Sequence, residues 1–245
     1  MTLIQLLVRH INTMKNNDKE KNNRNLCSEI QEYNARKKKD LEYPGRLSVL
    51  IESYLSASEL PDESQLKREF SKHIIVSLVA WMQDRFREMI KAAIDFKDAR
   101  NEAIPEFPEV KITIDIVRKL MNKEFTLGNF FAHLNSVSNP QGVNASFKSA
   151  YGISFYDSME QYHLGNLGES PEDSALLYKS FVVGFEKLYS DRNVLAHEEA
   201  RDFMITDMEL YEFIRIGIVF ESFEDNLRST KFFDLSKPGA SISES

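Results

Sequence analysis

The stretch that decides the fold is Ile74-Ile75-Val76-Ser77-Leu78-Val79-Ala80-Trp81-Met82. It is apolar on most faces of a helix, and it lies in the middle of a helical pattern that runs from Asp62 to about Phe96. Asp62 and Glu63 suit the positive N-terminal end of such a helix. Because a long helix that is apolar nearly all round belongs in the middle of a bundle, this stretch predicts an all-α fold.

The composition agrees with a helical fold. The chain has 245 residues, of which 42% are hydrophobic and 28% charged, with only nine glycines and seven prolines. A chain of this length can bury a substantial core, and so few glycines and prolines argue against a fold with many tight turns. The sequence contains no internal repeat and no segment that predicts a strand.

Helical periodicity continues after the long helix. We expect further helices at about 112–122, 127–137, 155–163, from Ser170-Pro171 into the residues around 192, and from 206 to about 228. Capping signals mark the starts of four of them: Thr126, Ser154, Ser170 and Thr206. Asn139-Pro140 is expected to end the helix at 127–137.

The residues before the long helix predict a separate arm. Residues 1–60 contain helical patterns at about 1–14 and 26–43, and a short one after Pro44-Gly45 that ends near Ser56. We therefore expect a basic N-terminal helical arm at 1–60, a helical bundle at 61–231, and a serine-rich tail at 232–245 that is disordered.

Charge is unevenly distributed along the chain. The formal net charge is −7, but residues 1–46 contain ten Lys/Arg and six Asp/Glu, so their net charge is +4 and that of the remainder is −11. The densest basic cluster is Lys37-Lys38-Lys39, with Arg36 and Arg46 nearby. This cluster is a candidate for binding a nucleic acid, and a solvated helix face is the alternative.

Several classes of protein are disfavoured by what the sequence lacks. It has no run of roughly eighteen apolar residues and no leader pattern, so we expect a cytoplasmic protein that does not enter a membrane. The single cysteine, Cys27, excludes an internal disulfide and fits a reducing compartment. There is no Gly-rich phosphate loop, His-Glu-x-x-His, paired Cys-x-x-Cys or nucleophile elbow, so we expect neither a metal nor a cofactor.

The best candidate for chemistry is Arg192-Asn193-Val194-Leu195-Ala196-His197, hereafter the Arg192–His197 segment. Its spacing alone is weak evidence, because Arg68 and His73 repeat it. The second copy lies early in the long helix, whereas the Arg192–His197 segment lies where a helix should end. On a helix, Asn193 and His197 share a face, and Arg192 is about 140° round and about 7.5 Å along from His197. A guanidinium and an imidazole could therefore meet at one phosphate.

This segment resembles the Arg-x4-6-His motif of HEPN domains (higher eukaryotes and prokaryotes nucleotide-binding), in the Arg-Asn-x-x-Ala-His form common among bacterial defence and toxin systems. The long helix with Trp81, Thr126-Leu127-Gly128-Asn129 and Asn139-Pro140 add to the resemblance, which covers roughly residues 60–230. One departure is that an acidic residue often follows the tryptophan directly in such proteins. Here Met82 and Gln83 precede Asp84, which puts a role for Asp84 in doubt.

The resemblance implies a HEPN-like helical bundle and metal-independent endonucleolytic cleavage of RNA, in a toxin–antitoxin or antiviral (phage) defence setting. His197 would move a proton, Arg192 would hold the phosphate, and Asn193 would orient the histidine or contact the backbone. Because one chain supplies one such histidine, we expect a homodimer, with an antitoxin or effector protein as a possible further partner. The helices with Phe181, Phe185 and Phe213–Phe223 are candidates for the interface, and a core role is the alternative.

Two other interpretations remain open. The chain could be a non-catalytic HEPN-like module that dimerises or binds a partner. It could also be purely structural at this segment, with His197 interacting with the helix dipole and Arg192 paired with Glu198 or another acid.

Overall fold

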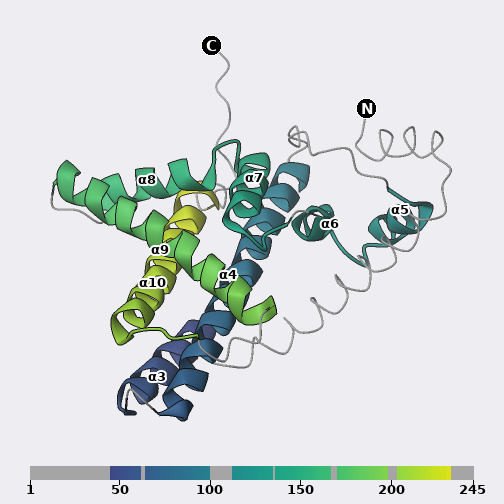
Figure 1. Ribbon diagram of the computed structural model, residues 1–245. Helices are drawn as coiled ribbons and strands as arrows, with labels where there is room; N and C mark the ends of the chain where they lie inside the picture. The colour runs from purple at the N-terminus through teal and green to yellow at the C-terminus, as the bar shows by residue number, and fades with distance from the viewer. Residues whose placement is uncertain are drawn as a thin grey trace. The chain divides into compact units, whose positions relative to one another are not determined.

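The computed structural model describes residues 45–61, 64–99, 112–134, 136–166, 170–197 and 203–232. Every regular element in these ranges is an α-helix, as Figure 1 shows, so the prediction of an all-α fold is confirmed. The described residues fall into two compact units: unit 1 contains 83–157, and unit 2 contains 46–82 and 158–232. No described helix combines the length and the hydropathy needed to cross a bilayer.

The predicted long helix is α4, Gln65–Ala99. Its residues up to Met82 belong to unit 2, and those from Gln83 belong to unit 1. Ser64 accepts a hydrogen bond from the Lys67 amide at 3.1 Å and so caps the start, while Asp62 and Glu63 lie outside the described residues. Five side chains of the deciding stretch have no exposed surface: Ile74, Ile75, Leu78, Val79 and Met82. This part of α4 is therefore the buried helix of unit 2, as predicted.

Unit 1 contains α5 (Ile114–Met121), α6 (Leu127–Leu134), α7 (Pro140–Tyr151) and the second half of α4. The rings of Phe86 and Phe147 both meet Phe155 edge-on, with centroids 5.0 and 5.7 Å away. The Tyr151 hydroxyl donates to the Met89 carbonyl at 2.9 Å. Aromatic packing and this hydrogen bond join α4 to α7.

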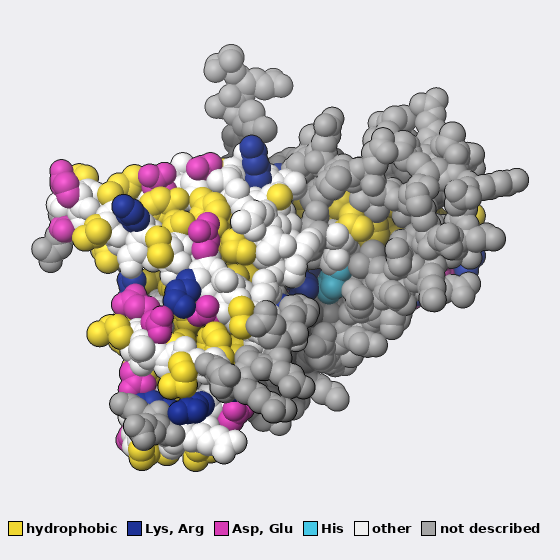
Figure 2. Space-filling model, viewed as in Figure 1, with side chains coloured by type: hydrophobic (Ala, Val, Ile, Leu, Met, Phe, Trp, Pro, Cys, Tyr) yellow, Lys and Arg dark blue, Asp and Glu magenta, His cyan; other side chains and the backbone are white. Residues whose placement is uncertain are grey.

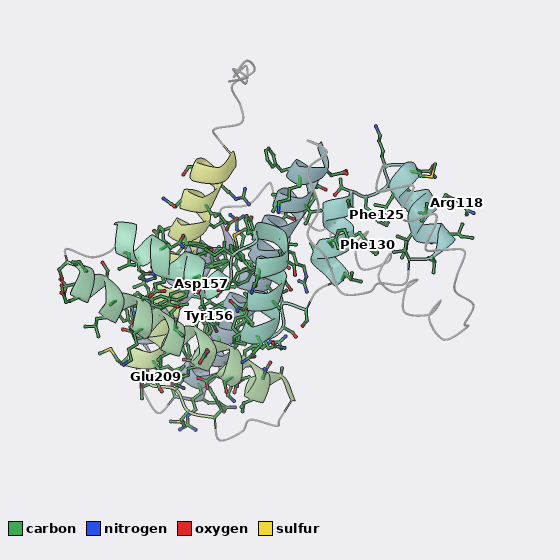
Figure 3. The ribbon with its side chains drawn as sticks, turned by 90° about the horizontal axis from the view of Figure 1, so that it is seen from above. Arg118, Phe125, Phe130, Tyr156, Asp157 and Glu209 are labelled. Atoms are coloured by element: carbon green, nitrogen blue, oxygen red, sulfur yellow. The ribbon has the colours of Figure 1, made fainter. Side chains whose placement is uncertain are left out.

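The start of α6 is held by a carboxylate of α4. Asp95 accepts hydrogen bonds from the Gly128 amide at 2.7 Å and from the Thr126 hydroxyl at 2.9 Å. A Cβ at position 128 would lie 2.6 Å from Asp95 Oδ1, so this approach requires glycine. The Thr126 hydroxyl also accepts from the Asn129 amide at 3.1 Å, which confirms the predicted cap. Figure 3 labels Phe130 on α6 and Phe125 just before the helix.

The structure corrects the interpretation of Asn139-Pro140. The preceding helix already ends at Leu134, and Asn139 instead caps α7, with its side-chain oxygen accepting from the Gly142 amide at 2.8 Å. Pro140 is the first residue of α7, where a missing amide hydrogen costs nothing. An Asn-Pro pair is compatible with a turn and with a helix start, and only the latter occurs here.

Unit 2 contains α3 (Arg46–Ser58), the end of α8 (Phe155–Asn166), α9 (Pro171–His197) and α10 (Asp207–Phe232), with the first half of α4. α10 packs against both α3 and α9. Trp81 of α4 meets Phe220 of α10 edge-on, with centroids 5.7 Å apart. Residues 1–44 and 233–245 lie outside the described residues, so the arm and the tail stay predictions.

The phenylalanines proposed for an interface lie in the core of unit 2. Their exposed fractions are 1% for Phe181, 0% for Phe185, 1% for Phe213 and 2% for Phe223. The core role is therefore confirmed for these side chains. Whether the exposed faces of the same helices form an interface stays a prediction.

The remaining capping predictions are confirmed. The Asp157 amide donates to the Ser154 hydroxyl at 3.1 Å, and the Asp173 amide donates to the Ser170 hydroxyl at 3.1 Å. Ser170 therefore begins α9, the helix that carries the Arg192–His197 segment.

Candidate functional site

The Arg192–His197 segment forms the C-terminal end of α9. α9 is described as far as His197, whose side chain lies outside the description. Arg192, Asn193 and the apolar pair that follows are half-buried, while Ala196 is exposed. The segment is thus partly packed and partly open to solvent.

The guanidinium of Arg192 contacts the neighbouring amide. Arg192 Nη1 donates to Asn193 Oδ1 at 3.0 Å. No carboxylate among the described residues forms an ion pair with Arg192, and the proposed partner Glu198 lies outside them. The contact that the structure records for Asn193 is with the arginine. The expected contact with His197 stays a prediction, because that side chain lies outside the description.

Two arginines of α10 pair with acids. Arg215 is 2.8 Å from Glu212, and Arg228 is 2.7 Å from the fully buried Glu224. Such pairs compensate the positive charge. Arg192 differs because its acceptor at 3.0 Å is a neutral carboxamide.

A lysine one turn earlier joins α9 to the start of α10. Lys187 Nζ lies 2.8 Å from Asp191 Oδ2 and 3.5 Å from Glu209 Oε1, and it is 5.8 Å from the centroid of the Phe213 ring. Figure 3 labels Glu209 on α10. Figure 2 shows acidic and basic side chains side by side on the visible face of this unit. Only the Lys187–Asp191 spacing of i, i+4 was visible in the sequence, and the contact with Glu209 was missed.

Glu209 is itself fixed by the cap of α10. The Thr206 amide and hydroxyl each donate to Glu209 Oε2 at 2.9 Å, and the Glu209 amide donates back to the hydroxyl at 3.2 Å. This reciprocal arrangement is the predicted capping box. The carboxylate that meets Lys187 is therefore held at a set position.

The pKa values in this cluster favour the charged forms. Burial of Lys187 opposes its charge, but the hydrogen bond and charge of Asp191, with those of Glu209, outweigh burial and raise the pKa of Lys187 above 10.5. Hydrogen bonds from Thr206, with a smaller contribution from Lys187, lower the pKa of Glu209 below 4.5. Both groups are charged at neutral pH.

The second copy of the spacing is arranged differently. Arg68 lies in the second turn of α4, half-buried, and its Nε is buried without a hydrogen-bond partner. His73 is exposed, and its Nε2 lies 3.4 Å from the hydroxyl of Ser77. The structure records no hydrogen bond between Arg68 and another side chain in the described ranges.

The other candidate residues have separate locations. Asp84 belongs to unit 1 and lies 3.4 Å from Arg87 Nη1. The basic cluster Lys37-Lys38-Lys39 lies outside the described residues, so its role in binding substrate stays a prediction. Within the described ranges, no group of three or more His, Cys, Asp or Glu is placed to hold a metal ion.

His163 is the buried histidine of α8. It is 1% exposed, and its Nδ1 lies 2.8 Å from the Met159 carbonyl. The rings of Tyr178 and Phe181 of α9 lie 5.8 and 5.6 Å from it, centroid to centroid. Burial lowers the pKa of His163 below 6.5, against the hydrogen bond to Met159, and the charge of Arg215 lowers it further. A neutral imidazole in an aromatic cluster is a packing residue.

Known proteins supply no match for this chain: no family model matches it, and neither do any curated proteins or solved structures.

Proposed function

We propose that this protein is a metal-independent RNA endonuclease of the HEPN class that acts as a homodimer. The observation that carries the proposal is the state of Arg192 at the end of α9. The residue is half-buried, and its guanidinium is hydrogen-bonded to a neutral amide and not paired with any described carboxylate. A cation in this state can neutralise a phosphate, which a cation in an ion pair does poorly.

The residue types of the segment match the chemistry. In the proposed reaction the ribose 2′-oxygen attacks the adjacent phosphorus and the 5′-oxygen of the next nucleotide leaves, giving a 2′,3′-cyclic phosphate and a 5′-hydroxyl. His197 transfers a proton to or from one of these oxygens, an effect worth roughly 10²–10⁴-fold in rate. Arg192 stabilises the negative charge that accumulates on the phosphate.

A dimer supplies the second proton-transfer group. The reaction needs a base for the 2′-hydroxyl and an acid for the leaving oxygen, and each chain has one histidine in the Arg192–His197 segment. A two-fold axis would bring the same segment from both chains to one phosphodiester. We place the basic cluster Lys37-Lys38-Lys39 in substrate binding, where it would contact the RNA backbone.

The setting follows from the resemblance of the segment to the Arg-Asn-x-x-Ala-His form of bacterial HEPN proteins. We propose a cytoplasmic toxin or phage-defence nuclease whose activity an antitoxin or effector protein controls. A wild-type protein that is inactive alone and cleaves after such a partner is added or removed would agree with this setting.

The test is cleavage of single-stranded RNA in EDTA by the purified full chain, beside Arg192→Ala and His197→Ala. We expect the wild type to give products ending in a cyclic phosphate and both variants to lose at least 10²-fold in rate. Circular dichroism checks that the variants are folded. Cleavage by the variants at the wild-type rate would remove this segment from the mechanism.

A non-catalytic HEPN-like module is the second candidate, and the net charge favours it. Outside residues 1–46 the chain has a net charge of −11, which suits a protein partner better than RNA. In that case the protein would bind its partner without turnover, and His197→Gln would bind as well as the wild type.

A further inference from the structure

Asp191 and Asn193 flank Arg192 in the sequence. The contact of Arg192 with Asn193 shows that its guanidinium reaches a side chain at an adjacent position of the helix. Asp191 is the other adjacent position, and its carboxylate would be the stronger acceptor because it is charged. The guanidinium nevertheless bonds to the amide.

The ion pair of Lys187 with Asp191 explains why the guanidinium of Arg192 bonds to Asn193. The Lys187 ammonium lies 2.8 Å from Asp191 Oδ2, and only 14% of the Asp191 side chain is exposed. The carboxylate is therefore already bound to a cation and turned towards the preceding turn of α9. Arg192 is left with Asn193 and keeps its charge uncompensated among the described residues.

The position of Lys187 depends on α10. A lysine that precedes an acid by four residues is the less favourable order on an isolated helix. Here Glu209 adds a second carboxylate at 3.5 Å, and the buried Phe213 ring lies 5.8 Å from the ammonium. The start of α10 thus holds the lysine over Asp191.

We propose that Lys187 is a positioning residue: by binding Asp191, it keeps the guanidinium of Arg192 available to an anionic ligand. Only the identity of that ligand, a phosphodiester of RNA, rests on the proposed function. Without Lys187, the carboxylate of Asp191 turns to Arg192 and compensates its charge.

The experiment measures the reactivity of Arg192 itself and needs no substrate. The folded full chain is treated with phenylglyoxal, which attacks the neutral form of a guanidinium, and modification of Arg192 is followed by mass spectrometry of its peptide. Wild type is compared with Lys187→Met, Asp191→Asn and the double variant. Lys179→Met serves as the control, because Lys179 is an exposed lysine of the same helix.

We expect Lys187→Met to slow modification of Arg192 roughly fivefold, because a neighbouring carboxylate that pairs with the guanidinium stabilises its charged, unreactive form. The double variant should return to the wild-type rate, since the competing carboxylate is gone, and Lys179→Met should match the wild type. An unchanged rate in Lys187→Met overturns the proposal. A double variant that stays as slow as Lys187→Met also overturns it, because the carboxylate of Asp191 would then not cause the slowing. A double variant that reacts faster than the wild type overturns it too, because loosening of the helix would then control the rate.

A second measurement separates this proposal from the nuclease proposal. The same variants are titrated with a 2′-O-methyl RNA oligonucleotide, which can bind but cannot be cleaved. Loss of affinity in Lys187→Met with recovery in the double variant supports RNA phosphate as the ligand. If the phenylglyoxal rates follow the expected pattern but neither the wild type nor any variant binds this RNA, the positioning role is upheld and RNA is excluded as the ligand.

Discussion

The chain contains the Arg-x4-His spacing twice in unit 2, and the two copies have different surroundings. Arg68 and His73 lie in the first turns of α4, which continues to Ala99. The Arg192–His197 segment is the end of α9. Arg68 has a buried Nε without a partner and His73 is exposed, whereas Arg192 is held by an adjacent amide.

We infer that the position of the two residues within a helix matters more for their function than the Arg-x4-His spacing. At the end of a helix, the last carbonyls carry partial negative charge and favour cations. The predictions below test whether function follows this difference.

The largest expected difference is between the alanine variants of His197 and His73. We expect His197→Ala to lower the rate of RNA cleavage by roughly 10²–10⁴-fold, because the proton-transfer group is lost. His73→Ala should remain within about twofold of wild type, since a surface residue away from the site has no part in proton transfer. Single-turnover assays under identical conditions measure both. Equal losses of cleavage rate in His197→Ala and His73→Ala would contradict the inferred difference between the two copies of the spacing.

The two arginines should differ by a smaller factor. Arg192→Lys keeps the charge but loses the planar pair of donors, so we expect about a tenfold lower cleavage rate. Arg68→Lys should cleave like the wild type. The measurement is kcat with saturating RNA, and a similar loss in both variants would mean that Arg68 also contributes.

Removing the cap of α10 and removing the cap of α4 should lower stability by similar amounts but should affect activity differently. Thr206→Val removes the hydroxyl of the α10 cap, and Ser64→Ala removes that of α4; each should lower the free energy of unfolding by about 1 kcal/mol. Because Glu209 is positioned by Thr206, Thr206→Val should also lower cleavage about twofold to threefold. Urea denaturation and the cleavage assay together check this, and a loss of activity in Ser64→Ala would contradict it.

His163 should affect the pH dependence of stability without taking part in the proposed catalysis. The pKa of His163 is lowered in the folded state, so the unfolded state binds more protons as the pH falls through 6.5. The stability contributed by neutral His163 is therefore present above pH 6.5 and is lost towards lower pH. In urea denaturation at pH 7.5 and 5.5, His163→Gln should show a weaker decrease than the wild type. If the free energy of unfolding of His163→Gln decreases as much as that of the wild type, other titrating groups cause the decrease.

Local signals in the sequence determined the helices and their starts. The period of apolar residues predicted α4, and Thr126, Ser154, Ser170 and Thr206 predicted helix starts, because a cap bonds to an amide only a few residues away. All of α7 was missed, because Asn139-Pro140 signals a turn and a helix start equally well and was interpreted only as the end of the preceding helix.

Only the tertiary structure decided which charges meet and which apolar residues are covered. Lys187 and Glu209 are far apart in the sequence and come together because α9 and α10 pack against each other, so no local pattern could reveal the contact. The same packing places Phe181 and Phe213 in the core. Periodicity identifies an apolar face of a helix, but the neighbouring helix determines what covers that face. The amino-acid sequence therefore specified the Arg192–His197 segment, and packing specified its electrostatic surroundings.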